Sequence, residues 1–294
     1  MAKTTKKSAK TAVKKKTTKK VAKPKNTAKI YPPPTKGPKV LIFDIETAPI
    51  IAHVWGLWEN NVGLNQIVKD WHVISWSAKW LDSPESEVMY MDQRGLKKVE
   101  DDKNLLQQIW NLLNEADVVI TQNGIKFDQR KLNARFVLNG MGKPSSFRHI
   151  DTARIAKRHF DFTSYKLAYM TDKLCTKYKK LTHHGKFAGH EMWTECLKDN
   201  IEAWQEMEKY NRYDVLSLEE LYHVLIAWDS SIDFSVYTEE EKRVCSCGGD
   251  KFIKNGFVYT NSAKYQRYQC KGCKKEHRGR INLFSPEKKA SLKQ

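Results

Sequence analysis

The sequence feature that most constrains the fold is an apolar run ending in two acids, VLIFDIET at residues 40–47. A run of this length with β-branched members is typical of a buried strand. Side chains at i and i+2 of a strand lie on the same side, so Asp44 and Glu46 should project together. Two carboxylates beside an apolar core repel each other, and a divalent cation would offset that cost. The alternative is a strand that ends in a solvated acidic turn. Whether the chain supplies further acids in suitable positions distinguishes a metal site from such a turn.

Charge is divided into three blocks along the 294 residues. Residues 1–38 contain 13 Lys and no acids, and residues 242–294 contain 14 Lys and Arg against three acids. Because the whole chain has a formal charge of +18, the residues between these ends have a net charge of −6. This distribution suits an enzyme that collects metal cations at its centre and holds a polyanion with its ends. Two solubilising tails are the simpler alternative.

The length allows one good-sized domain with attachments. No apolar run is long enough to span a membrane, and the N-terminus lacks the apolar segment of a secretory signal. We therefore expect a cytoplasmic protein of a bacterium or of a virus-infected cell, with the nucleus as the alternative. In such a compartment the six cysteines should be thiols or metal ligands rather than disulfides.

The first 30 residues are mainly Lys, Ala and Thr. They include too few large apolar side chains to offset the entropy lost on ordering, so we predict a disordered tail that contacts phosphates. A solubility tail and a localisation signal are the alternatives. Pro32-Pro33-Pro34 and Gly37-Pro38 predict a stiff, non-helical spacer before the first strand.

The middle of the chain predicts the order β-β-β-α-β-α-β-α. Residues 82–87 form the turn of an antiparallel meander, whereas the Trp-rich residues 53–71 follow no pattern that we can assign. Residues 165–197 predict short helices and loops, whose His183, His184 and His190 either contact phosphate or simply lie on the surface. After the first strand, the predicted elements are strands over 74–80 and 88–91, a helix capped by Asp101 or Asp102, a strand over 118–121, a helix over 129–139, a strand over 147–151 and a helix over 199–228.

Two further acids lie in contexts that suit a functional carboxylate. Asp128 begins a helix directly after the sequence NGIKF, where a plain N-cap is the alternative role. Tyr210 and Asp214 are four residues apart and share one face of the last helix. A carboxylate on a packed face needs a partner, although a packing aromatic and a surface acid would also fit these two positions. Asp151 is interpreted as a structural cap of the helix that follows it.

Three motifs, D-I-E-T at residues 44–47, N-G-x-x-F-D at 123–128 and Y-x-x-x-D at 210–214, resemble the three motifs of the DEDD family of 3′–5′ exonucleases. The tyrosine four residues before the last aspartate is similar to the tyrosine subclass, because Lys209 stands where the histidine subclass has histidine. The resemblance covers roughly residues 39–228. It implies an RNase H-like α/β fold, with a mixed five-stranded sheet flanked by helices.

The resemblance also implies catalysis by two Mg²⁺ or Mn²⁺ ions about 3.5–4 Å apart, which activate water and stabilise the leaving oxygen. Tyr210 would orient the attacking water, because an unperturbed pKa of about 10 makes it a poor base. Asn123 and Phe127 would support the terminal nucleotide. The first ion would be held by Asp44, Glu46 and Asp214, and the second by Asp44 and Asp128.

A second module is predicted over residues 240–285. Cys245-Ser-Cys247 and Cys270-Lys-Gly-Cys273 are two close thiol pairs at Gly-containing turns, and this spacing predicts a structural Cys₄ zinc site. Two strands of a predicted hairpin separate the pairs, and the module resembles a zinc ribbon. Its first pair is C-x-C where ribbons usually have C-x-x-C, so His277 is an alternative ligand.

The ribbon is also rich in Lys and Arg, with Tyr259, Tyr265 and Tyr268 between them. Basic side chains hold phosphates and aromatic rings stack on unpaired bases, so the ribbon is expected to present a nucleic-acid strand to the acidic centre. The alternative is a small module that only stabilises the fold, with charges that keep it soluble. Cys175 and Cys196 have no partner at metal-binding spacing and are expected to be buried.

The sequence thus predicts three parts, a tail and linker over 1–38, an exonuclease domain over 39–230 and a zinc ribbon over 240–285. The predicted function is metal-dependent 3′–5′ exonuclease activity on nucleic acid, with DNA favoured over RNA. The alternatives are a non-catalytic nucleic-acid-binding protein on a degenerate exonuclease scaffold and an RNase H-like endonuclease. The complete set of four acids and a tyrosine favours the exonuclease.

Overall fold

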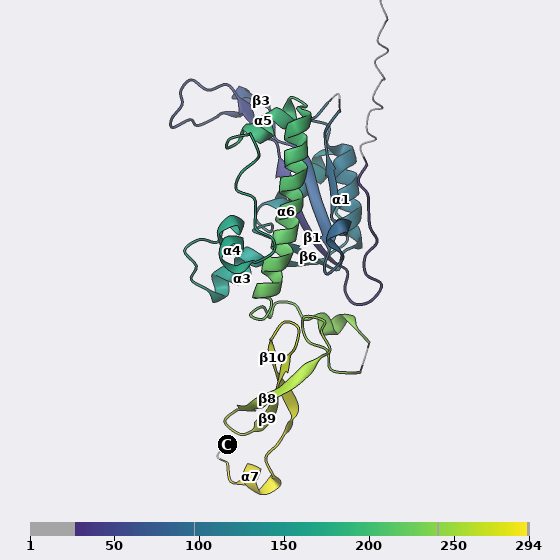
Figure 1. Cartoon of the computed structure of the whole chain (residues 1–294), viewed down its shortest axis with the longest axis vertical. Helices are drawn as coiled ribbons and strands as arrows, with labels where there is room; N and C mark the ends of the chain where they lie inside the picture. Colours follow the sequence, from purple (N-terminus) through teal and green to yellow (C-terminus); the bar gives the residue numbers. More distant parts are fainter. Residues whose placement is uncertain (1–26, 97, 240, 293–294) are drawn as a thin grey trace, which may run out of the picture.

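The computed structural model describes residues 27–96, 98–239 and 241–292 (Figure 1). The predicted disorder of the Lys-rich tail falls mainly on residues 1–26, which lie outside the described residues. Residues 27–39 form no helix or strand, as predicted for the proline spacer. They nevertheless pack against the core of the large domain. The Ala28 amide donates to Gln108 Oε1 of the helix Lys103–Glu115 at 3.1 Å, and the Trp80 indole of the sheet donates to the Tyr31 carbonyl at 2.9 Å.

The central layer is the predicted mixed five-stranded sheet, in the order β5-β4-β1-β6-β7. β1, β4 and β5 pair antiparallel, which confirms the meander. β6 and β7 run parallel to β1, because each is reached through a crossover helix. The strands are β1 (Val40–Thr47), β4 (Val73–Trp80), β5 (Met89–Asp92), β6 (Val118–Thr121) and β7 (Arg148–Asp151).

Helices cover both faces of this sheet (Figure 1). One face packs against α1 (Lys103–Glu115) and α2 (Asp128–Leu138). The other packs against α3 (Thr152–His159), α4 (Leu167–Leu174) and the long α6 (Ile201–Leu225). Among the described residues, no helix has the length and apolarity that a membrane span requires.

The alternation of side chains along β1 fixes where its acids point. Leu41, Phe43 and Ile45 pack in the cluster with α1 and α2. Val40 and Ile42 pack in the cluster with α6. Asp44 and Glu46 continue this second series, so the period of two in a strand directs them toward α6.

α6 begins at Ile201, slightly later than the predicted residue 199. Asp199 is not part of the helix because it has a positive φ of 60°, and its Oδ1 accepts from the Gly95 amide at 2.8 Å. Asn200 is the N-cap instead, with its side chain accepting from the Glu202 amide. The helix is preceded by α5 (Glu191–Leu197), and its predicted buried stripe is confirmed for Leu218, Leu221 and Leu225.

The Trp-rich segment without an assigned pattern forms a separate two-stranded hairpin that projects from the molecule beside α5 (Figure 1). Its strands are β2 (Ile51–Ala52) and β3 (Ile67–Lys69), with a short 3-10 helix, Leu64–Gln66, before β3. The pairing is too short to produce a recognisable alternation in the sequence.

A small antiparallel sheet in the order β10-β9-β8 lies beyond the C-terminal end of α6. β8 (Phe252–Tyr259) and β9 (Lys264–Cys270) form the predicted hairpin. The third strand, β10 (Glu276–Asn282), was not predicted, because three of its seven residues are charged and it includes a glycine. A short helix, α7 (Pro286–Ala290), follows.

Candidate active site and metal centres

Three acids from two segments that are far apart in the sequence meet near the C-terminal end of β1. Asp44 and Glu46 from β1 and Asp214 from α6 each offer a carboxylate oxygen, and these atoms all lie within 4.8 Å of one another. Asp214 is buried, whereas Asp44 and Glu46 are half-buried. Hard divalent cations prefer carboxylate oxygens, so this group has the donor set of a Mg²⁺ or Mn²⁺ site.

Asp128 joins the same neighbourhood from α2. Its Oδ1 accepts from the backbone amide of Ile45, which lies between the two acids of β1, at 3.2 Å. Phe127 occupies the N-cap position of α2, so Asp128 is the first helical residue rather than the cap. Its charge is close enough to raise the pKa of Asp44.

Burial raises the pKa of every acid in this group. The pKa values rise to about 7 for Glu46 and about 7 for Asp128, with burial as the largest cause in both. Burial also raises the pKa of Asp214, to about 6, although Lys180 opposes the shift. The pKa of Asp44 lies well above its usual range because of burial and then because of the neighbouring Asp214 and Asp128. Carboxylates arranged in this way need cations in order to be ionised together.

Lys180 supplies one cation from the loop between α4 and α5. Its ammonium donates to Asp214 Oδ2 and lies 4.2 Å from the centroid of the Tyr210 ring. Burial alone would lower the pKa of Lys180, but the charges of Asp214, Tyr210 and Asp44 raise it above its usual range. Lys180 was not predicted as a site residue, because one lysine among several in a loop has no distinguishing sequence pattern.

Neutral donors hold the carboxylates of β1 in place. Asn211 Nδ2 donates to Asp44 Oδ2 at 2.6 Å, and Ser75 Oγ donates to Asn211 Oδ1 at 3.3 Å. The Trp193 indole donates to Glu46 Oε2 at 2.9 Å. These residues were also missed, although the fully buried amide of Asn211 directly after Tyr210 is a signal that helical spacing could have found.

Tyr210 lies in an aromatic group at the same site. Its ring centroid is 4.8 Å from that of His184 and 5.8 Å from that of Trp193. Burial and then the charge of Asp214 raise the pKa of Tyr210, so its hydroxyl stays protonated at neutral pH. A protonated phenol suits orientation of a water molecule better than proton abstraction. Of the three loop histidines, the structure places His184 against this tyrosine.

The site has an unsatisfied polar atom that a cation would satisfy. Oδ1 of Asp214 is buried and has no hydrogen-bond partner among the described residues. An orphaned buried carboxylate oxygen is costly unless an ion or water contacts it. Together with the converging oxygens of Asp44 and Glu46, this atom fits a divalent metal ion.

Asn123 and Phe127 lie in the turn that leads into α2 and Asp128. Asn123 has a positive φ of 61°, and its amide donates to Asp151 Oδ1 at 2.9 Å. Asp151 also caps α3, which confirms its structural role. A cavity of about 510 Å³ is lined by Asn123 and by three lysines, Lys157, Lys166 and Lys180. Phe127 is 41% exposed, with Lys131 Nζ 5.8 Å from its ring centroid.

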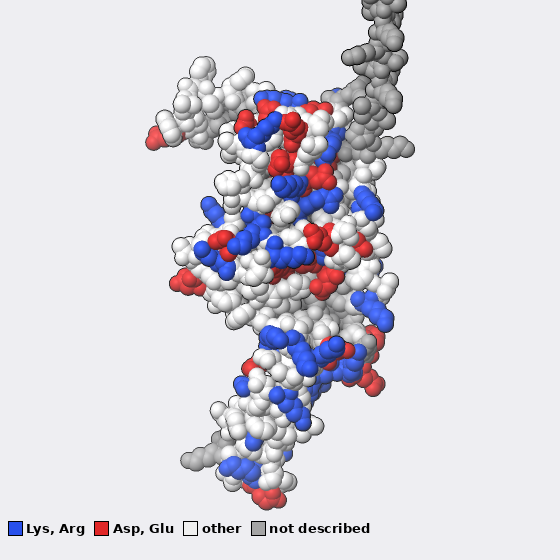
Figure 2. Space-filling model, viewed as in Figure 1, with Lys and Arg blue, Asp and Glu red and all other residues white. Residues whose placement is uncertain are grey.

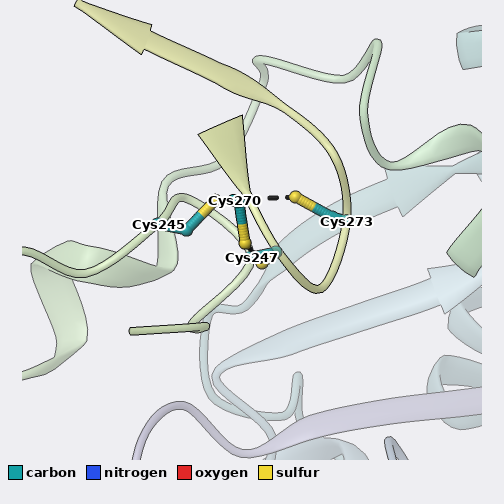
Figure 3. Close-up of side chains that lie close together, drawn as sticks. All are labelled: Cys245, Cys247, Cys270 and Cys273. Carbon is teal, nitrogen blue, oxygen red and sulfur yellow. Dashed lines mark hydrogen bonds between the residues drawn. The ribbon is translucent and has the colours of Figure 1, made fainter. Parts of the chain in front are cut away.

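The four ribbon cysteines converge as predicted, and Figure 3 shows their side chains pointing toward one another. The Sγ atoms of Cys245 and Cys273 are 3.5 Å apart, and those of Cys247 and Cys270 are 3.8 Å apart. A tetrahedral ion with Zn–S bonds of about 2.3 Å requires sulfur separations near these values. His277 Nε2 lies 3.0 Å from Cys245 Sγ, so it is a neighbour of the cluster.

Two glycines make the short C-x-C turn possible. Gly248 has a positive φ of 88°, and a Cβ on Gly249 would lie 3.3 Å from Cys270 Sγ. The Gly249 amide instead approaches Cys247 Sγ at 3.4 Å. Hydrogen bonds, led by that from Cys245, lower the pKa of Cys247 to about 5, which favours the thiolate that a metal binds. Cys175 and Cys196 are buried and free, as expected.

Comparison with known proteins places the chain in a superfamily. The profile of the RNase H superfamily matches residues 72–226, which include Asp128, Tyr210 and Asp214. The structure of the family B DNA polymerase from the archaeon Pyrobaculum calidifontis is similar, with a TM-score of 0.47 and 18% sequence identity. That match covers 68% of this chain and 25% of the polymerase chain. No curated protein sequence matches. Because the profile covers more than half of the residues, the chain belongs to the RNase H superfamily.

Proposed function

We propose that this protein is a metal-dependent 3′–5′ exonuclease that hydrolyses phosphodiester bonds, in DNA rather than in RNA. The observation that supports it is the convergence of Asp44, Glu46 and Asp214 within 4.8 Å, with Asp128 on the adjoining amide of β1. An RNase H-like sheet that ends in such a group of carboxylates has the donor set for phosphodiester hydrolysis by two ions.

Two Mg²⁺ or Mn²⁺ ions would activate water and stabilise the leaving 3′ oxygen. Asp44, Glu46 and Asp214 would bind one ion, and Asp44 with Asp128 would bind the other. The protonated hydroxyl of Tyr210 would orient the attacking water. Asn211 and Trp193 keep their carboxylate partners oriented, so that little reorganisation is needed when an ion binds.

The lysine-lined cavity beside Asn123 suits the phosphates of the terminal nucleotides. Lys157 and Lys166 form no ion pair with any described residue, so their charge is available to a polyanion. Phe127, directly before Asp128, offers an exposed ring. These positions support the roles inferred for Asn123 and Phe127.

The ribbon would bind one structural zinc ion through Cys245, Cys247, Cys270 and Cys273. Its contribution to nucleic-acid binding is proposed to be mainly electrostatic. The Arg243 guanidinium lies 3.6 Å from the centroid of Tyr268, and that of Arg278 lies 4.5 Å from the centroid of Tyr265. Rings already covered by arginine are poorly available for bases, and Tyr259 is the exposed exception.

The test is incubation of 5′-labelled single-stranded and double-stranded DNA and RNA with Mg²⁺. We expect stepwise shortening from the 3′ end, and we expect Asp214→Asn to lower the rate by at least a thousandfold while substrate binding persists. Asp172→Asn, at an exposed acid away from the cluster, is the matched control and should cut normally. Internal cuts would indicate an endonuclease, and an Asp214→Asn variant as fast as the parent would refute the assignment.

One observation favours the non-catalytic alternative. Lys180 already neutralises Asp214, and in a degenerate site such an ammonium would replace the metal ion. Titration with Mn²⁺ followed by calorimetry distinguishes the two cases. The exonuclease requires saturable binding that Asp214→Asn weakens, whereas a protein that shifts labelled DNA, leaves it uncut and binds no Mn²⁺ would be the scaffold.

A further inference from the structure

We call Asp44, Glu46, Asp128 and Asp214 the acid site. The hairpin that projects near it exposes an unusual amount of apolar surface. We name residues 50–69 the apolar arm. Trp55 is fully exposed at 101%, and Trp58 and Leu64 are exposed at 87% and 88%. Figure 2 shows this projection as almost uncharged, in contrast to the body of the molecule. The large apolar side chains exposed along it are Ile50, Ile51, Val54, Trp55, Leu57, Trp58, Val62, Leu64 and Val68.

The apolar arm is an ordered hairpin. The His53 amide donates to the Gln66 carbonyl at 2.9 Å, beyond the β2–β3 pairing. At the tip, Asn60 Nδ2 donates to the Gly56 carbonyl at 2.6 Å. Its two tryptophans alone expose roughly 300–500 Å², which equals the largest apolar patch of a typical monomer. A surface of this size that stays in water indicates a binding partner.

Both ends of the apolar arm are anchored at the acid site. Thr47 follows Glu46 directly, and Ala48 packs in the cluster that contains Tyr210. The Ala48 amide donates to the His72 carbonyl at 2.9 Å, which closes the base of the arm. Trp55 is nine residues from Glu46, so at about 3.3 Å per residue it lies no more than about 30 Å from the acids.

Basic side chains lie near the C-terminal end of the apolar arm. Lys131 Nζ is 3.6 Å from the ring centroid of Trp71, the residue that precedes His72. Lys126, Arg130 and Lys131 surround the start of α2 and form no ion pair with any described residue. The arm has no Lys or Arg between residues 50 and 68. Phosphate contacts are therefore available at its base, and apolar or stacking contacts along its length.

We propose that the apolar arm binds unpaired bases of the strand whose 3′ end occupies the acid site, with Trp55 and Trp58 stacking on them. This inference rests on the proposed exonuclease function, because it requires a strand that leads away from the acids. Stacking of a base on an aromatic ring tolerates any sequence, because every base has a flat face. The arm would hold a strand several nucleotides from the bond that is cut.

The test measures binding of 5′-fluorescein-labelled oligothymidylates of 3 and 15 nucleotides by anisotropy, without added divalent metal so that nothing is cut. Replacing both residues in W55A/W58A should weaken 15-mer binding at least tenfold and leave 3-mer binding unchanged. Both side chains are exposed, so the variant should fold. Trp228→Ala removes another half-exposed tryptophan, beyond the C-terminal end of α6, and is the matched control that should bind like the parent.

A second pair of variants separates stacking from general apolar contact. W55F/W58F keeps flat rings and should bind the 15-mer within about threefold of the parent, whereas W55L/W58L should bind as weakly as the alanine variant. A leucine variant that binds like the parent, or an alanine variant that does, would overturn the proposal. Sedimentation that shows a dimeric parent and a monomeric W55A/W58A would assign the arm to a second copy of the chain instead.

The readout is independent of the cleavage assay. If the parent binds the 15-mer through the arm but cuts nothing, the proposed exonuclease activity fails and the strand-binding role of the arm stands. If the parent cuts from the 3′ end and the arm variants bind normally, the role of the arm fails alone.

Discussion

The buried carboxyl groups of the acid site make the stability of the metal-free protein depend on pH. Burial raises the pKa of Glu46 to about 7, above the value near 4.5 of an exposed glutamate. The folded state therefore binds more protons than the unfolded state between about pH 4.5 and 7. The stabilisation that protonated Glu46 contributes is fully present below about pH 4.5, and it is lost as the pH rises to about 7.

Glu46→Gln should remove part of this dependence. We expect the parent to lose more unfolding free energy between pH 5 and 7.5 than the variant does, by on the order of 1–2 kcal/mol, because a half-buried group is partly screened. Urea denaturation of metal-free protein at the two pH values measures this difference. Glu191→Gln, at an exposed residue of α5, is the control. Equal pH dependence in the parent and Glu46→Gln would show that Glu46 is not desolvated.

At the scale of elements, Asp102 joins three of them. Asp102 is the N-cap residue of α1, as predicted, but its carboxylate accepts no hydrogen bond from the first turn of that helix. Oδ2 accepts from the Val73 amide of β4 at 3.1 Å, and Arg135 of α2 donates to both oxygens at 2.7 Å. This buried pair fixes β4, α1 and α2 relative to one another, and α2 positions Asp128.

Asp102→Ala should therefore destabilise the fold strongly. Removing one partner of a buried ion pair leaves the other charge uncompensated, and we expect a loss of about 3 kcal/mol in urea denaturation. Asp101→Ala is the matched control, because Asp101 is exposed and its carboxylate accepts from the Lys103 amide at 3.4 Å without being part of a buried ion pair. Its loss should stay under about 1 kcal/mol. Similar losses for the two variants would contradict this role of Asp102.

The sequence predicted the elements that have a strong local pattern. The strand that includes Asp44 and the helix that includes Asp214 are long and periodic, and both lie close to their predicted bounds. The pairing of β2 with β3 was not predictable, because the exposed apolar residues of this short hairpin follow neither the alternation of a strand nor the spacing of a helix. β10 was missed because its position depends on pairing with β9 rather than on its own composition.

At the scale of the whole molecule, the cysteine cluster is attached to the large sheet region. Cys247 and Cys273 pack against the core cluster that contains Tyr222 and Ile226 near the end of α6. The Phe234 amide also donates to the Ser246 carbonyl at 3.0 Å. A metal ion in the cluster would thus stabilise the end of the helix whose middle holds Tyr210 and Asp214.

Loss of that ion should lower the stability of the whole protein. We expect one zinc per chain by metal analysis, and we expect Cys270→Ser to abolish it and lower the melting temperature by about 2–8 °C. Ser246→Ala is the control, because Ser246 stands between two of the cysteines in the sequence and is not one of the four clustered ligands. Zinc-free parent protein with an unchanged melting temperature would show that the ribbon is energetically separate.

The sequence by itself determined the secondary structure around each motif and the identity of the acids, because strand and helix periods and turn residues act over a few positions. Only the tertiary structure decided that Asp44, Glu46 and Asp214 share one site with Lys180. It also decided that a tryptophan hairpin projects beside them. The physical reason is that these contacts join segments far apart in the chain. They depend on how whole elements pack, and local propensity does not encode packing.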